Sequence, residues 1–128
     1  MIAAGLAGAA HAEGTGPLEV PSGLALGHLE TIEEPAGAAS GGLPLVRFRF
    51  LAPALADGTT RYPDMAEDFP ALCAGWALPW AEKAGHAEAR AVISMSDRML
   101  PFGATDPEAV QFFEAYRIRD GRCELEPF

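Results

Sequence analysis

Hydrophobic and polar residues are mixed along two neighbouring stretches of the chain, residues 24–33 and 43–51. In the second stretch they alternate, with large apolar residues at every second position from 46 to 50 and arginines between them. The intervening loop, 34–42, is rich in turn formers. This pattern predicts a hairpin with one face on the core and the other in water. The apolar face would carry Val46, Phe48 and Phe50, and the polar face would carry Arg47 and Arg49.

A helical periodicity follows in the middle of the chain. Apolar residues recur there at intervals of four, three, one and three, which places them on one face of a helix. Pro70 removes a backbone donor and is expected to kink or restart this helix, and Pro79 is expected to open a further turn through Lys83. The apolar face consists of Met65, Phe69, Leu72, Cys73 and Trp76.

Three features organise the last third of the chain. Residues 91–95 form an apolar run typical of a strand buried on both faces. Thr105 and Glu108 have the spacing of a capping box, which predicts a single helical turn. Asp120-Gly121 lies between alternating stretches and predicts a two-residue hairpin turn.

The turn at 120–121 fixes the register of this last hairpin. Its paired positions separate into an apolar face and a charged face, on which Arg117 and Glu124 form a favourable cross-strand pair. Glu114 shares the apolar face, so we expect it to be buried and paired with a base, Arg98 being the candidate. The predicted pairs are Arg119 with Arg122, Ile118 with Cys123, Arg117 with Glu124, and Tyr116 with Leu125.

These elements predict an α+β fold in the order β-β-α-β-β-β, with one main kinked helix packed on one face of an antiparallel-rich sheet. A further short strand is expected at residues 18–20. The apolar residues 1–12 end in Ala10-His11-Ala12, which has the small side chains that a signal peptidase requires. We therefore expect 1–12 to be the remnant of a signal peptide, 13–128 to be one domain, and the protein to be periplasmic or secreted.

Composition and charge narrow the function classes. The chain has 128 residues, of which 49% are hydrophobic, enough for a modest core. Its net charge of −9 repels phosphate backbones and anionic lipid headgroups, and its basic residues are scattered among acids along the sequence. Apart from the first dozen residues, no apolar run approaches the eighteen or so needed to cross a bilayer. We expect no nucleic-acid partner and no membrane insertion of the mature chain.

The chain has only two cysteines, Cys73 and Cys123. One lies in the apolar face of the helix and the other on the apolar face of the last hairpin, so a helix lying across that face would bring them together. In an oxidising periplasm such a pair should form a disulfide. The alternative is two reduced cysteines buried as small hydrophobic residues.

Four stretches carry a resemblance to a known family: VRFRFLAP at 46–53, VISMSDR at 92–98, FGATDPE at 102–108 and QFFEAYR at 111–117. The chain resembles a family of small exported alphaproteobacterial proteins of unknown function, over most of its length after residue 12. Some members of that family are labelled acetolactate synthase. That label does not fit a chain without the length or the diphosphate-binding motif of a thiamine-diphosphate enzyme. The resemblance implies export and one folded unit, and it implies no active residues.

Candidate binding residues come from the first hairpin. His28 and Glu30 share one predicted strand face, and pairing would bring them near Arg47 and Arg49. Such a mixed set can bind an anion or move a proton. The simpler interpretation is the solvated face of a sheet, where polar side chains are ordinary. The sequence shows no phosphate loop, nucleophile elbow or metal-ligand spacing, so no cofactor and no metal is expected.

Candidate catalytic residues are Asp97 and Arg98, at the end of a predicted buried strand, together with the inward Glu114. The alternatives are an ion pair or turn cap for the first two and structural pairing for the third. The leading interpretation is a non-enzymatic binding domain for a protein or small molecule. Its rivals are a small enzyme using these three residues and an accessory subunit of an envelope complex, which would expose an apolar patch.

Overall fold

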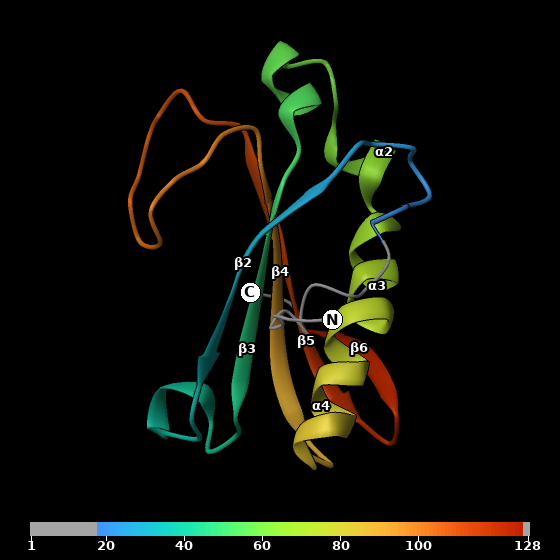
Figure 1. Ribbon diagram of the computed structural model, residues 1–128, viewed down its shortest axis with the longest axis vertical. Helices are drawn as coiled ribbons and strands as arrows, with labels where there is room; N and C mark the ends of the chain where they lie inside the picture. The colour runs from blue at the N-terminus through green and yellow to red at the C-terminus, as the bar shows by residue number, and fades with distance from the viewer. Residues whose placement is uncertain (1–17, 127–128) are drawn as a thin grey trace, which may run out of the picture.

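A five-stranded sheet with helical segments along one face makes up the fold (Figure 1). The structure is a computed structural model, and it describes residues 18–126. The predicted α+β architecture, with an antiparallel-rich sheet and one main bent helix, is confirmed. The strands are β2 (Gly27–Glu34), β3 (Leu45–Leu51), β4 (Ala89–Ser96), β5 (Gln111–Arg119) and β6 (Arg122–Glu126).

The strands lie in the sheet in the order in which they occur along the chain, β2-β3-β4-β5-β6. Three of the four pairings are antiparallel, and β3 pairs with β4 in parallel. Parallel neighbours need a long crossover, and the helical segments between β3 and β4 provide it. One face of the sheet is therefore covered by helix, and we call the opposite face the open face.

The crossover is an irregular helix. It begins after a short 3₁₀ turn, η3 (Pro53–Asp57), and comprises α2 (Tyr62–Met65), α3 (Asp68–Leu72), a π-helical turn η4 (Cys73–Ala77) and α4 (Leu78–Ala84). A second 3₁₀ turn, η2 (Ala38–Ser40), lies in the hairpin loop. The predicted apolar stripe is confirmed, since all five of its residues are buried.

Pro70 restarts the helix, which is one of the two outcomes expected for it. The helix breaks before Asp68, and Pro70 lies in the first turn of α3, where its missing N–H needs no intrahelical partner. Pro79 opens α4 as predicted. Because Pro79 has no N–H to donate back along the helix, the wider π-helical turn immediately before it accommodates its ring.

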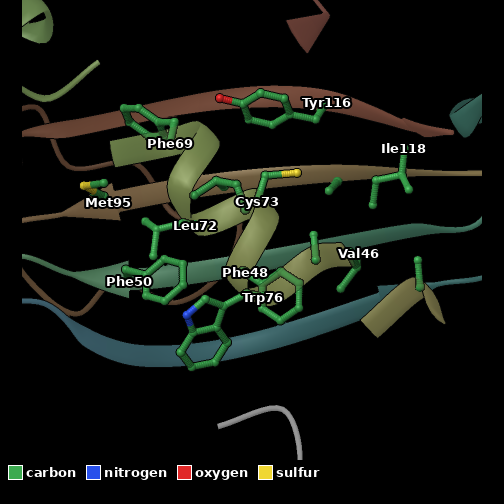
Figure 2. Close-up of a cluster of buried hydrophobic side chains, with 14 of the residues drawn as sticks. Val46, Phe48, Phe50, Phe69, Leu72, Cys73, Trp76, Met95, Tyr116 and Ile118 are labelled. Carbon is green, nitrogen blue, oxygen red and sulfur yellow. The ribbon is translucent and has the colours of Figure 1, made fainter. Parts of the chain in front are cut away.

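The core lies between the helix and the apolar face of β3, β4 and β5 (Figure 2). Phe48 and Phe50 point from β3 toward Trp76, whose indole ring lies 5.8 and 5.2 Å from their ring centroids in edge-on geometry. Cys73 and Cys123 form a disulfide with Cα atoms 6.4 Å apart, which is the pairing predicted from the sequence. This bond joins the helix to the last strand.

A buried carboxylate connects the N-terminal segment of the described chain to the helix. Asp68, at the start of α3, is fully buried and accepts hydrogen bonds from the backbone N–H and the hydroxyl of Ser22, at 2.9 and 2.5 Å. These bonds satisfy the carboxylate that burial removes from water. Residues 18–20 form no strand, contrary to prediction, and Val20 packs against the core from an irregular segment.

The last hairpin has the predicted register, with all four residue pairs in place. Asp120 and Gly121 both have positive φ, as a tight hairpin turn of this kind requires. The ion pairs do not follow the register, however. Arg117 lies 3.6 Å from a carboxylate oxygen of Glu126, whereas Glu124 pairs with arginines near the turn. The predicted Arg117–Glu124 ion pair is therefore wrong, although the two residues are register partners.

Candidate functional site

The loop of residues 97–110, between β4 and β5, folds over part of the open face (Figure 1). The polar face of the predicted hairpin is thus only partly exposed to water, contrary to expectation. A pocket of about 300 Å³ lies between this loop and the sheet; we call it the loop pocket. It is lined by Arg47, Arg49, Val92, Ser94, Pro101, Phe102, Gly103, Ala104, Thr105, Gln111 and Phe113.

Asp97 and Arg98 hold the base of this loop closed. The Arg98 guanidinium donates to both carboxylate oxygens of Asp97, at 3.1 and 2.9 Å, and it also pairs with Asp106 at 3.4 Å. The Asp97 backbone N–H donates to the Val110 carbonyl, and the Val110 N–H donates to the Asp97 carboxylate. The contacts of these two candidates are therefore those of an ion pair that positions the loop.

The predicted helical turn at 105–108 is absent from the loop. The carboxylate of Asp106, and not the hydroxyl of Thr105, accepts the hydrogen bond of the Glu108 N–H at 2.9 Å. Asp106 thus forms a local turn while its second oxygen binds Arg98. The capping-box prediction is wrong because the Asp106 carboxylate, and not the Thr105 hydroxyl, accepts from the Glu108 N–H.

The Arg98 hydrogen bonds hold the pKa of Asp97 below its usual range, although burial opposes this shift. Because the pKa in the folded state is lowered, the closed loop gains stability above the usual carboxyl range. It loses that stability as pH falls through the lowered pKa. We expect the urea midpoint of the wild type to fall more between pH 6 and pH 2 than that of Asp97→Asn. An equal fall in both proteins would contradict this role for Asp97.

Two arginines lie beneath the loop. Arg49 is buried, pairs with Glu30 and donates to the Leu100 carbonyl at 2.5 Å. Arg47 is partly exposed, and its Nε donates to Glu34 at 2.9 Å. Both guanidinium groups also face the ring of Phe102, with Cζ 5.1 Å (Arg47) and 5.9 Å (Arg49) from its centroid.

A β-bulge separates His28 from Glu30, which the sequence analysis placed on one strand face. The register with β3 shifts at this point, so that His28 pairs with Phe50 and Glu30 pairs with Arg49. His28 therefore faces the helix, where its ring lies 4.8 Å from that of Trp76. Of the four predicted binding residues, the structure brings together Glu30, Arg47 and Arg49 and places His28 on the opposite face.

Glu114 is buried, as predicted, but its partner is not Arg98. Its carboxylate accepts a hydrogen bond of 2.5 Å from the Tyr116 hydroxyl, two residues along the same strand face. Arg98 is occupied by the loop carboxylates. Burial and the neighbouring Glu114 raise the pKa of Tyr116 far above its usual range, so the phenol stays protonated and donates. No hydrogen bond or ion pair among the described residues joins Glu114 to Asp97 or Arg98.

Replacing Glu114 with alanine leaves the neutral Tyr116 hydroxyl without its acceptor, and it leaves no arginine unpaired. We therefore expect a loss of about 1–3 kcal/mol in the free energy of unfolding, the cost of one unsatisfied buried donor. Tyr116→Phe and the double variant complete a double-mutant cycle, measured by urea denaturation, in which the two effects should be strongly non-additive. Additive losses would show that the two side chains do not interact.

The sequence analysis missed Phe102 and Phe113. The only sequence signal for Phe102 was a large aromatic side chain in a loop rich in proline and glycine. Both side chains are 53% exposed. Leu100 was missed for a different reason, because its backbone carbonyl, not its side chain, contacts Arg49.

Two kinds of feature are absent from residues 18–126. No group of three or more histidine, cysteine, aspartate or glutamate side chains there has an arrangement that could hold a metal ion. Within the same residues, no helix combines the length and apolar character needed to cross a bilayer.

Comparisons with known proteins identify the family and no more. No curated protein matches the chain, and no solved structure matches it. One family model matches residues 2–128, nearly the whole sequence. The chain therefore belongs to that family, which is described as a family of unknown function (DUF6497).

Proposed function

We propose that this protein is an exported, non-enzymatic binding domain whose ligand site is the loop pocket. The ligand class that fits best is a small organic acid with a flat apolar body. The observation that carries the proposal is the arrangement of Arg47 and Phe102, which places a guanidinium and an aromatic ring together in one pocket. Ligand sites commonly combine a mostly apolar lining with a few polar groups, and 300 Å³ is at the small end of their range.

The two parts of such a ligand have separate partners. Val92, Phe113 and the ring of Phe102 offer apolar contact to its body. Glu34 occupies only the Nε of Arg47, and the Nη groups have no hydrogen-bond partner within residues 18–126. Two parallel N–H donors suit a carboxylate, which a guanidinium binds in a two-pronged geometry. Arg49 is already bound to Glu30 and Leu100, so it supports the pocket floor.

We also propose that the protein has no catalytic role, because the three candidate catalytic residues are occupied by structural contacts. Asp97 and Arg98 are occupied with each other and with the loop, and Glu114 is bonded to Tyr116 on the helix side of the sheet. None of the three lines the loop pocket. A small enzyme built from this trio therefore has less support than a binding site.

A matched pair of probes tests the proposal. Benzoate and benzyl alcohol share a ring but differ in the carboxylate, and each is titrated into ¹⁵N-labelled protein. We expect benzoate to bind more tightly and to shift amide signals of β3 and the loop 97–110. Arg47→Gln should reduce its affinity about tenfold, as expected for loss of a charge-assisted hydrogen-bond pair. Arg61→Gln, which removes the same charge from an exposed site at the start of α2, is the control.

Equal binding of the two probes, or equal effects of the two arginine variants, would contradict the proposed ligand class. Shifts spread over the whole protein would contradict the proposed site. Phe102→Ala provides a second check, since it removes the ring that both arginines face. The Phe102 side chain is exposed and lies outside the core, so this substitution should leave the core intact.

Export is the second part of the proposal. The Ala10-His11-Ala12 sequence, which lies outside the described residues, supports it, as does the disulfide, because such bonds persist mainly in oxidising compartments. Mass spectrometry of the protein isolated from its own cells should find a mature N-terminus at Glu13. A cytoplasmic protein that retains residues 1–12 would contradict export and leave the binding test unaffected.

One observation favours a second function, the docking of a partner protein. Met99, Phe102 and Phe113 are large apolar side chains more than half exposed, and all three belong to or adjoin the loop 97–110. Aromatic and methionine side chains are enriched at protein interfaces. Affinity capture from a periplasmic extract should then retain a partner with wild type and with Leu18→Asp, but lose it with Met99→Asp. Identical capture by all three proteins would exclude this surface.

A further inference from the structure

The open face concentrates the positive charge of an acidic protein. Basic residues are scattered along the sequence, but alternation and strand register bring most of them to one side of the sheet. The chain as a whole carries a net charge of −9. Six of its nine basic residues lie on this face, namely Arg47, Arg49, Arg90, Arg117, Arg119 and Arg122.

Four of these arginines cluster near the last hairpin, away from the loop pocket. A hollow of about 370 Å³ opens there, and none of its lining residues lines the loop pocket. We call it the arginine hollow. It is lined by Arg90, Arg117, Arg119, Glu124, Leu125 and Glu126.

The carboxylates in the arginine hollow do not balance its arginines. Glu126 pairs with Arg90 at 2.9 Å and with Arg117 at 3.6 Å. Glu124 is shared in the same way by Arg119, at 2.9 Å, and by Arg122, at 3.3 Å. Three of these arginines line the hollow and Arg122 lies beside it, so four guanidinium groups share two carboxylates. The four arginines and two glutamates together retain two positive charges, which favour an anion of matching charge.

Arg117 is the least satisfied member of the cluster. Its Nε is buried and has no hydrogen-bond partner within the described residues, since the nearest Glu126 oxygen is too distant for a good bond. A buried donor without an acceptor is unfavourable, so this guanidinium gains from any acceptor that lets it reorient. The side chain is about one-third exposed, which leaves its Nη side within reach of the hollow.

We propose that the arginine hollow binds a small divalent oxyanion, a phosphate or sulfate group. Such a group carries the two negative charges that the cluster lacks, and it presents several oxygens to the donors of Arg90, Arg117 and Arg119. The planar fork of arginine suits this geometry. The site is independent of the proposed organic-acid pocket, so either can exist without the other.

Titration with inorganic phosphate and with sulfate, at constant ionic strength set by sodium chloride, tests the proposal. Amide shifts should saturate and be confined to β4, β5 and β6. Arg117→Gln should weaken binding about tenfold, whereas Glu126→Gln should tighten it about threefold because it removes a competing carboxylate from beside two arginines. Arg61→Gln loses the same charge at the start of α2, which lies at the opposite end of the molecule from the β5–β6 turn (Figure 1), and should leave the affinity unchanged.

The two opposed variants separate binding from folding. A variant that merely disturbs the hairpin weakens binding, but only removal of a competing acceptor strengthens it. Shifts that do not saturate, or that chloride reproduces at the same ionic strength, show an adventitious ion only and overturn the proposal. Weaker binding by Glu126→Gln in a folded protein also overturns it, as does an equal effect of Arg61→Gln.

Discussion

Replacing Cys73 and Cys123 with alanine is expected to lower the free energy of unfolding by about 4 kcal/mol. The disulfide spans 50 residues of sequence, and in the chain-entropy description a cross-link of that span restricts the unfolded chain by this amount. A domain of this size has a total stability of about 5–15 kcal/mol. Loss of the bond therefore removes a large part of what keeps the protein folded.

Urea denaturation of the wild type with and without reductant measures the effect, and the double alanine variant is its control. Reductant should destabilise the wild type and leave the variant unchanged. Thiol titration of the unfolded, unreduced wild type should find no free thiol. Two free thiols, or a variant as stable as the oxidised wild type, would contradict the predicted contribution.

Trp76→Ala is expected to cost about 3–5 kcal/mol, the range for removing a large aromatic side chain from a core. Trp76 is only 3% exposed, lies in the π-helical turn, and contacts the rings of Phe48 and Phe50. The neighbouring backbone is joined to β6 through Cys73, so the helix is poorly able to move into the cavity. Thermal unfolding followed by far-ultraviolet circular dichroism measures the loss.

Two substitutions serve as controls for this experiment. Trp76→Phe keeps an aromatic ring at the position and should recover most of the stability. Trp80→Ala removes the second tryptophan, which is half-buried and contacts the His86 ring in a tilted geometry, so the loss should be clearly smaller. If the two alanine variants were equally destabilised, Trp76 would not be the central core residue that its contacts indicate.

Local patterns predicted much of the fold. The period-two alternation located β3 and β5, and the Asp120-Gly121 turn fixed every pair of the last hairpin, because a two-residue turn leaves only one register. The apolar stripe of the helix and the inward position of Cys123 were sufficient to predict the disulfide. In each case neighbouring residues alone determine which face a side chain occupies.

The errors arose where distant or non-periodic features decide the structure. The bulge after His28 inserts one residue into β2, so that His28 and Glu30 point to opposite faces of the sheet although they are two residues apart. The sequence pattern gives no sign of this bulge. The burial of Arg49 depends on Leu100, 51 residues away, because the loop folds back over the sheet. Glu114 was correctly placed inside, but its hydrogen-bond partner is Tyr116 on the same strand and not an arginine.

The candidate site was predictable in part. The pairing of β2 with β3 brought Glu30, Arg47 and Arg49 together as expected. The pocket itself was not foreseen, because it exists only through the loop 97–110, whose course depends on the contacts of Asp97 with Arg98 and Val110. The arginine hollow was also missed. The hairpin register placed Arg117 and Glu124 on the charged face, but Arg90 joins them only through the pairing of β4 with β5, which local patterns do not determine.

The disulfide also determines what a single cut in the backbone can do. The loop 97–110 lies between the two cysteines in sequence, and several of its side chains are exposed, as protease-sensitive segments usually are. A protease that cleaves there divides the chain, but β5 and β6 remain attached to the helix through sulfur. The nicked protein would migrate as one species on a non-reducing gel and as two fragments on a reducing gel, so the pocket could be opened without either fragment being lost.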